Sequence, residues 1–177
     1  MHYSFAPSVS RQTPAANLGA ANLHHPGVDV VPHPGGAGLC LRTTRPFAEG
    51  ECIIREQPIA HFPTSLIGIF RAFAALPASS QEAVLSLHAN PTLQFRASTG
   101  QRSLTLEGFA EMLQGNGCTL GPEELARAYR GVRAVAANAC RSSLQAETLR
   151  VFKTISRINH SCLPNARRVE SPEGFEI

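Results

Sequence analysis

The sequence contains no tryptophan, only two tyrosines (Tyr3 and Tyr129) and a single lysine, Lys153, among its 177 residues. It also lacks an apolar run long enough to cross a bilayer as a helix, which argues against a transmembrane helix. The first residues carry neither a basic head nor an apolar segment, so a secretory signal is not expected. The length is close to that of an average domain and predicts one domain.

Strong charge is also missing, because 16 Lys and Arg residues oppose 13 Asp and Glu residues and leave a net charge of +3. This balance does not predict direct nucleic-acid binding, which needs clustered cations. The five cysteines are odd in number and never occur as Cys-x-x-Cys, so neither a disulfide scaffold nor a self-contained zinc module is expected. We therefore expect an intracellular protein, nuclear or cytoplasmic, without membrane association.

Hydrophobic residues make up 43% of the chain, which is enough for a folded core. Residues 1–24 are rich in Ser, Pro, Ala and Asn without a sustained period, and they predict a disordered tail. Residues 25–62 contain strand candidates separated by Gly and Pro, 63–150 predict a helical insert, and 151–177 predict a loop and the start of further strands. The order of strands, helices and strands predicts an α+β fold.

Hydrophobic periodicity and turn residues predict the individual elements. The expected elements are strands over 28–31, 38–43 and 51–56, a helix from Leu66 to Phe73, a helix with a Ser79 or Ser80 cap, a loop over 89–103, helices over 106–113 and from Pro122, and a hairpin that joins 166–170 to 175–177.

A glycine cluster, Gly35-Gly36-Ala37-Gly38, lies between the first two strand candidates. Glycines there allow positive φ angles and let a ligand lie against the backbone. The cluster does not continue as a dinucleotide fingerprint, since Leu41 occupies the position of the last glycine and no helix follows. From the residues alone, a ligand-binding turn and a plain hairpin turn both remain open.

A second polar cluster runs from Ser156 to Asn165 between apolar residues. His160 and Cys162 could be a fragment of a metal site, although two ligands do not complete a tetrahedral site. They could also form a Cys-His nucleophile, without any guarantee of productive geometry. The alternative is a hydrogen-bonded loop or a piece of core.

The segment Asn159-His160-Ser161-Cys162-Leu163-Pro164-Asn165 resembles the N-H-S-C-x-P-N signature of SET-domain protein lysine methyltransferases at every fixed position. Upstream, the segments 36–39, 47–51 and 54–56 are similar to the family's opening, in which a G-x-G-L turn precedes x-I-x-x-G-x-x-I-x-x-E. The helical stretch between the two motifs resembles the branch with a long helical insert, which includes SET-and-MYND proteins and related fungal proteins. The MYND zinc cluster is missing, because the Cys-x-x-Cys pairs are missing.

The resemblance implies a small β-rich SET-type core that a helical insert interrupts, and the transfer of methyl groups from S-adenosyl-L-methionine to a lysine of a protein substrate such as a histone. It also implies that the glycine turn and Asn159 meet at one pocket. The residues that it assigns to the cofactor are Gly36, Ala37, Gly38, Asn138, Ser156, Asn159 and His160. No metal site is implied, since Cys162 lacks the further cysteines that bind zinc in relatives.

The sequence departs from the family pattern at several positions. Ala37 replaces a residue that is often polar in this branch, and Cys140 replaces the aromatic residue expected after Asn138. The G-E-E-[LIV]-x-x-x-Y element with the catalytic tyrosine does not occur, and neither Tyr3 nor Tyr129 has a matching context. We therefore expect a C-terminally incomplete SET domain and assign no catalytic residue.

Three functions follow from these observations. The first is a SET-type protein-lysine methyltransferase, and the second is a non-catalytic truncated fragment or pseudoenzyme that binds a cofactor or a protein. The third is an interaction module in which the helical insert from Leu66 to Arg141 binds a partner.

Overall fold

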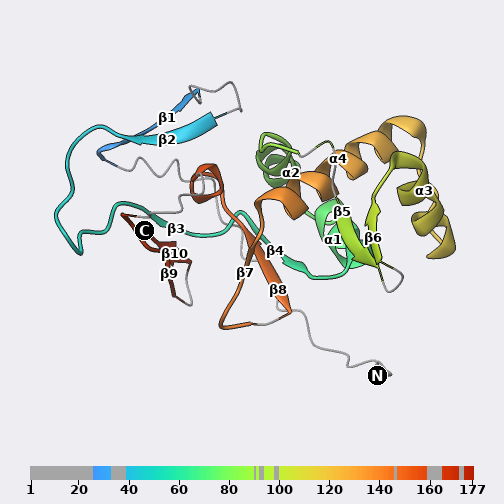
Figure 1. The fold of residues 1–177 in the computed structure, drawn as a ribbon. Coiled ribbons are helices and arrows are strands. Elements are labelled where there is room, and N and C mark those ends of the chain that lie inside the picture. Colours follow the sequence, from blue (N-terminus) through green and yellow to red (C-terminus); the bar gives the residue numbers. More distant parts are fainter. Residues whose placement is uncertain are drawn as a thin grey trace.

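The structure is a computed structural model, shown in Figure 1. It describes residues 26–32, 39–89, 91, 94–97, 100–145, 147–158, 165–171 and 174–177, with the backbone alone over 94–97 and 100–102. The described chain contains helices and small antiparallel sheets and has an α+β fold.

Short strands form four separate sheets in the described residues. The strands are β1 (Val28–Pro32) paired with β2 (Leu39–Thr43); β10 (Phe175–Glu176) between β3 (Arg55–Glu56) and β9 (Val169–Glu170); β8 (Thr148–Val151) between β4 (Ala60–Pro63) and β7 (Cys140–Arg141); and β5 (Gln94–Ala97) paired with β6 (Gly100–Ser103). Two of these sheets join strands that precede the four α-helices in the sequence with strands that follow them, because β3 pairs with β10 and β4 pairs with β8.

The helices are α1 (Leu66–Ala74), α2 (Ala78–Leu85), α3 (Leu106–Gly115), α4 (Pro122–Asn138) and the short 3-10 helix η1 (Ile155–Arg157). Side-chain caps define the N-terminal ends of α1 and α3: Ser65 Oγ accepts from Gly68 N–H, and Thr105 Oγ1 accepts from Gly108 N–H. In the described residues, none of the helices combines the length and the apolar character needed to cross a membrane.

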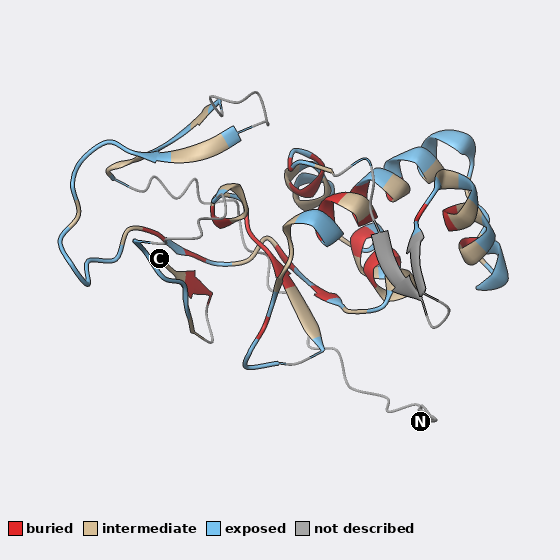
Figure 2. Ribbon diagram, viewed as in Figure 1, coloured by how far each residue is buried: buried red, intermediate tan, exposed pale blue. Residues whose placement is uncertain are grey.

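The larger of two cores, which we call the helical core, lies among α1–α4 and the inner faces of β4 and β8 (Figure 2). Phe109 and Val132 are completely buried in it. Helices α1 and α4 approach closely at Gly131, where an added Cβ would lie 2.5 Å from Cζ of Phe73. This contact explains a glycine in the middle of α4, where it is otherwise unfavourable.

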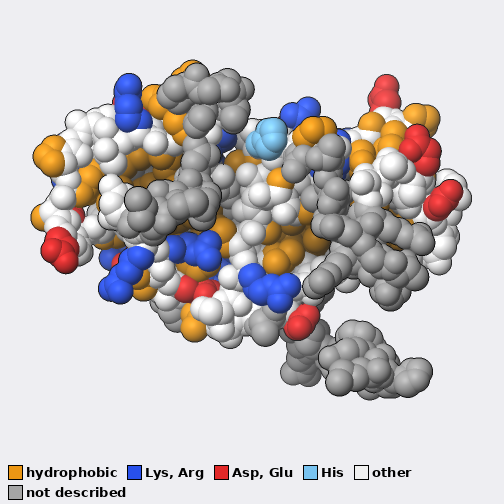
Figure 3. Space-filling view, viewed as in Figure 1, with side chains coloured by type: hydrophobic (Ala, Val, Ile, Leu, Met, Phe, Trp, Pro, Cys, Tyr) orange, Lys and Arg blue, Asp and Glu red, His pale blue; other side chains and the backbone are white. Residues whose placement is uncertain are grey.

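The smaller core, which we call the strand core, consists of the buried residues Ile54, Phe152, Ile155 and Phe175. The rings of Phe152 and Phe175 are stacked with their centroids 4.8 Å apart. Val28 and Leu41 pack against this core, so the β1–β2 hairpin joins the residues near the C-terminal end of the described chain. On the face shown in Figure 3, Lys and Arg side chains lie over β8–β10, whereas acidic side chains gather over α3.

Most of the predicted elements are confirmed. Strands β1 and β2, the β9–β10 hairpin, and helices α1, α3 and α4 lie where the sequence predicted them. The predicted apolar face of α4 is also correct, since Ala128, Val132 and Val135 are buried.

Other predictions were wrong. The loop predicted over 89–103 contains β5 and β6, whose strands hold only one large apolar residue and so show no alternating pattern. Helix α2 begins at Ala78 after Pro77, so Ser79 and Ser80 lie inside the helix rather than at its cap. The strand predicted over 51–56 is reduced to Arg55–Glu56, and the stretch 63–150 contains β5–β8 besides its helices.

Candidate functional site

The structure places two of the seven residues that the resemblance assigns to the cofactor, namely Asn138 and Ser156. Gly36, Ala37, Gly38, Asn159 and His160 lie outside the described residues, as does Cys162. The arrangement of the site is therefore built from Asn138, Ser156 and the segments that flank the two motifs.

Asn138 and Ser156 are 18 positions apart in the sequence and are joined directly by a hydrogen bond. Ser156 Oγ donates to the carbonyl oxygen of Asn138 at 3.2 Å and accepts from Phe152 N–H at 3.3 Å. The Asn138 carboxamide donates to the carbonyl oxygens of His88 at 2.6 Å and Ala134 at 2.7 Å. These bonds fix the end of α4 against η1.

Glu56, at the end of β3, holds the segment that leads into the Asn159 motif. Its side chain is 5% exposed. One oxygen accepts from Lys153 N–H at 2.9 Å and Thr154 N–H at 2.8 Å, and the other accepts from Thr154 and from Ile155 N–H at 2.8 Å. A carboxylate at the start of a helical turn satisfies backbone donors that have no partner within the turn. Glu56 therefore fixes where η1 begins.

Close backbone packing reinforces this arrangement. Gly174 is buried next to β3, and a Cβ added at Gly174 would collide with the carbonyl oxygen of Glu56. Strand β10 can therefore pair with β3 only because a glycine precedes it.

The described flanks of the two motifs pack against each other (Figure 1). Pro32 and Leu39 pair at the end of the β1–β2 hairpin, on either side of residues 33–38. Strand β2 lies against η1, which ends two residues before Asn159. The residue after the glycine turn and the turn before Asn159 therefore belong to neighbouring elements.

A buried ion pair connects β8 with β9. The Arg150 guanidinium, 2% exposed, lies 3.3 Å from Oε1 of Glu170. Ser142 Oγ donates to the Glu170 carboxylate at 2.6 Å, and the backbone N–H and hydroxyl of Ser143 donate to its other oxygen. Burial acts to raise the pKa of Glu170, but the hydrogen bonds from Ser142 and Ser143 and the charge of Arg150 outweigh it and lower the pKa to about 2. The carboxylate is therefore ionised over the physiological range.

The pair is incompletely satisfied on the arginine side. NH1 of Arg150 donates to the carbonyl oxygen of Ser171 at 3.1 Å, while Nε is buried without a hydrogen-bond acceptor among the described residues. The guanidinium carbon lies 5.9 Å from the centre of the Phe175 ring, and the Arg168 guanidinium lies 4.4 Å from the same ring. Two cations therefore face one aromatic side chain of the strand core.

Metal-binding and thiol groups are sparse in the described ranges, where no three His, Cys, Asp or Glu side chains come together. Cys40, Cys52, Cys118 and Cys140 are free thiols. Burial raises the pKa of the Cys140 thiol, against the opposing charge and hydrogen bond of Arg168. Cys140 is therefore protonated at neutral pH and is a poor nucleophile.

Sequence reasoning did not assign a role to three of these residues. Glu56 stood in the matched opening segment but only as a pattern position, and its backbone partners lie about a hundred residues away. Arg150 and Glu170 carried no signal, because a charged residue in a short strand is usually exposed.

Comparisons with known proteins do not add a relative: no protein-family model matches the sequence, and no curated protein is similar to it. The resemblance to SET-domain proteins therefore rests on the residues of the two motifs.

Proposed function

We propose that this chain binds S-adenosyl-L-methionine between its glycine turn and the Asn159–His160 segment, as part of a SET-type protein-lysine methyltransferase. The signature over 159–165 is the most specific support, since it matches the family at every fixed position. The observation that carries the proposal is the packing of β2 against η1, because it brings together the flanks of two motifs that are about 120 residues apart.

The described residues have chemistry that suits this cofactor. Both N–H donors of the Asn138 carboxamide are used by backbone carbonyl oxygens, so a ligand would meet its Oδ1 as an acceptor. The ammonium group and the adenine amine of S-adenosyl-L-methionine are donors. Ser156 holds the backbone of Asn138, and Glu56 fixes the start of η1. Together these hydrogen bonds anchor residues 153–156, which precede Asn159 in the sequence.

The cofactor supplies a methyl group on a sulfonium, and the acceptor in this proposal is a lysine of an intracellular protein, for example a histone, in the nucleus or the cytoplasm. The small β-rich SET-type core would hold the cofactor, while the helices of the insert would contribute to the choice of substrate. The same cofactor pocket suits many substrate proteins.

A second function is cofactor or protein binding without catalysis. Tyr129 favours it, because this residue belongs to the helical core: its ring packs on Phe109 and its hydroxyl donates to the carbonyl oxygen of Leu104. Tyr129 is therefore not available as a catalytic group. Tyr3, the other tyrosine, lies outside the described residues.

Calorimetric titration of the chain with S-adenosyl-L-methionine tests the proposal. We expect binding that is lost in Asn159→Ala, weakened in Ser156→Ala and unchanged in Ser86→Ala, a matched serine at the end of α2. Absence of binding by the folded wild-type chain would refute the cofactor site. A radiolabelled-methyl assay on mixed histones then separates the two functions, because binding without transfer supports the non-catalytic one.

A further inference from the structure

The turn between β7 and β8 contains a serine that is exposed and also bonded to a buried carboxylate. Residues 143–145 are exposed and lie between the two strands. Ser143 nevertheless contacts β9, since its hydroxyl and its backbone N–H both donate to Oε2 of Glu170. The Glu170 side chain is only 10% exposed. The turn therefore connects a surface position with a buried ionic contact.

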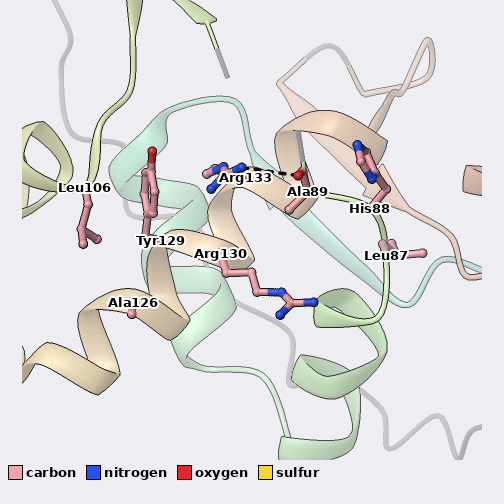
Figure 4. Close-up of a pocket in the computed structure, with 8 residues that line it drawn as sticks. All are labelled: Leu87, His88, Ala89, Leu106, Ala126, Tyr129, Arg130 and Arg133. Carbon is pink, nitrogen blue, oxygen red and sulfur yellow. Dashed lines mark hydrogen bonds between the residues drawn. The ribbon is translucent and has the colours of Figure 1, made fainter. Parts of the chain in front are cut away.

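The residues near Ser143 present an arginine and a leucine to solvent. Arg141, two positions earlier, is exposed, and its guanidinium forms no ion pair or hydrogen bond with a described residue. This arginine differs from Arg133 of α4, which donates to the carbonyl oxygen of Ala89 at 3.4 Å (Figure 4). Leu144, one position after Ser143, is 56% exposed. Both side chains are therefore accessible to another protein.

An arginine before a serine and an apolar residue after it form a pattern that suits a protein kinase. Carboxylates of the kinase bind the guanidinium through charge-assisted hydrogen bonds, and charge patterns of this kind determine which substrates a kinase accepts. Exposed turns are also the segments at which other proteins most often act. Ser142, the neighbouring serine, does not fit, because it is 2% exposed and its hydroxyl donates to Glu170.

We propose that Ser143 is a phosphorylation site for an arginine-directed serine kinase, and that its phosphate releases the β7–β8 turn from β9. In the reaction, Oγ of Ser143 forms a bond to the γ-phosphorus of ATP, the bond from this phosphorus to the oxygen that bridges it to the β-phosphorus breaks, and ADP leaves. The hydroxyl proton passes to the catalytic base of the kinase. This site is independent of the proposed cofactor site.

Phosphorylation removes a contact that Ser143 makes in the unmodified chain. The esterified Oγ has no proton to donate, and the phosphate carries a charge of about −1.5 to −2 beside the ionised Glu170 carboxylate. The two anions repel each other. Arg150 does not offset this repulsion, because its guanidinium is 2% exposed and is already held by Glu170 and by the carbonyl oxygen of Ser171. The phosphorylated turn therefore moves away from β9.

A kinase reaction on the full chain tests the site. The probe is the catalytic subunit of cyclic-AMP-dependent protein kinase, which selects serines preceded by arginine, with radiolabelled ATP. We expect label on residue 143 of the wild type, which is lost in Ser143→Ala and kept in Ser171→Ala. Ser171 is a matched control, since it follows Arg167 and Arg168 but is half-buried, with its hydroxyl bonded within its own turn. Arg141→Gln should lower the rate of transfer about tenfold.

Phosphoserine incorporated at position 143 during translation tests the structural consequence without a kinase. Amide exchange at 169–171 should rise about tenfold or more, while α1 and α4 stay protected. Phosphoserine at Ser86, an exposed position at the end of α2, adds the same charge elsewhere and should leave exchange at 169–171 unchanged. Ser143→Ala removes the hydroxyl without adding charge, so its rise should be smaller.

Three results would overturn the proposal. The kinase site is refuted if the folded wild type is not labelled, or if Ser143→Ala keeps the label. The release of the turn is refuted if phosphoserine at 143 leaves exchange at 169–171 as it is in the wild type. A rise in Ser143→Ala equal to that in the phosphoserine protein would refute repulsion from Glu170 as its cause.

Discussion

Among the described residues, the helical core contains sixteen buried apolar residues, which come from all four α-helices, from β4 and β8 and from the connecting residues Leu87 and Leu104, whereas the strand core contains four. Each fully buried aliphatic or aromatic side chain stabilises a fold by about 1.5–3 kcal/mol. Among the described residues, apolar burial therefore contributes several times more to the helical core than to the strand core.

In the strand core, polar contacts compensate for the smaller number of buried apolar residues. The carboxylate of Glu56 accepts hydrogen bonds from three successive backbone N–H groups, and Glu170 combines an ion pair with bonds from Ser142 and Ser143. The contacts of Glu170 depend on its ionisation, and the contacts of both carboxylates join distant parts of the sequence. One chain therefore combines apolar packing in its helical core with directional polar contacts around its candidate site. Five experiments test it.

The largest effect is expected from Phe109→Ala, because this ring is completely buried and packs on Phe70 and Tyr129. Removal of the ring should cost about 3–5 kcal/mol of unfolding free energy. In a chain without tryptophan, near-ultraviolet circular dichroism of Tyr129 reports on this core. An unchanged midpoint in urea would contradict the view that apolar burial holds the helical core.

A matched glycine pair compares the two cores directly. Gly131→Ala meets a phenylalanine ring that can shift, and it should cost about 1–3 kcal/mol. Gly174→Ala meets the Glu56 carbonyl oxygen, which cannot move without breaking β3–β10 pairing, so about 3 kcal/mol or more is expected. Hydrogen exchange should show that Gly174→Ala exposes 53–56 and 175–177 while α4 stays protected. Equal exchange in both variants would mean that the cores unfold together.

Glu56→Ala should leave backbone donors of Lys153, Thr154 and Ile155 without their acceptor. An unsatisfied buried donor costs about 1–3 kcal/mol, and entry of water limits the total to about 2–3 kcal/mol. Glu56→Gln keeps one acceptor oxygen and should cost less. Faster amide exchange over 153–157, with α1 unchanged, is the expected result, and an unaltered exchange rate would contradict the role of Glu56.

Acid should open the strand core before the helical core. Because the pKa of Glu170 is lowered to about 2 in the folded state, its stabilisation is complete above its ordinary value of 4.5 and is lost as the pH falls from 4.5 toward 2. Amide exchange at 169–171 should therefore rise in this window. In Glu170→Gln the rise should be smaller, and the same pH profile in both proteins would rule out Glu170 as its source.

The smallest effect is expected from Arg55→Ala. The Arg55–Glu176 pair joins β3 and β10 at 2.7 Å, but the arginine side chain is 75% exposed. Exposed pairs contribute about 0.2–1 kcal/mol. A loss well above this range in chemical denaturation would mean that surface charges, and not Glu56 and Glu170 alone, hold the strand core.

Local patterns predicted much of the fold. The period of Leu66 to Phe73 and the start at Pro122 placed α1 and α4, because helices depend on contacts within a few residues. The hairpins β1–β2 and β9–β10 were predicted from turn residues for the same reason. Strands β4, β7 and β8 were not, since their partners are far away in the sequence and each strand is too short to show alternation.

The candidate site was predicted less completely. The motif pattern named Asn138 and Ser156 separately, and the structure joins them through a hydrogen bond. The motif pattern gave no role to Arg150. Its guanidinium is buried because β8 lies between β4 and β7, and it pairs with Glu170 of β9. A pattern of residue types contains no information on which distant segment will cover a charge.

The sequence by itself determined the α+β class, the positions of most helices, and the two motifs on which the proposed function rests, because these depend on short-range periodicity and residue identity. Only the tertiary structure decided that Glu56 accepts from the backbone before Asn159 and that β2 lies against η1. The physical reason is that burial and hydrogen-bond partners arise when segments far apart in the chain pack together.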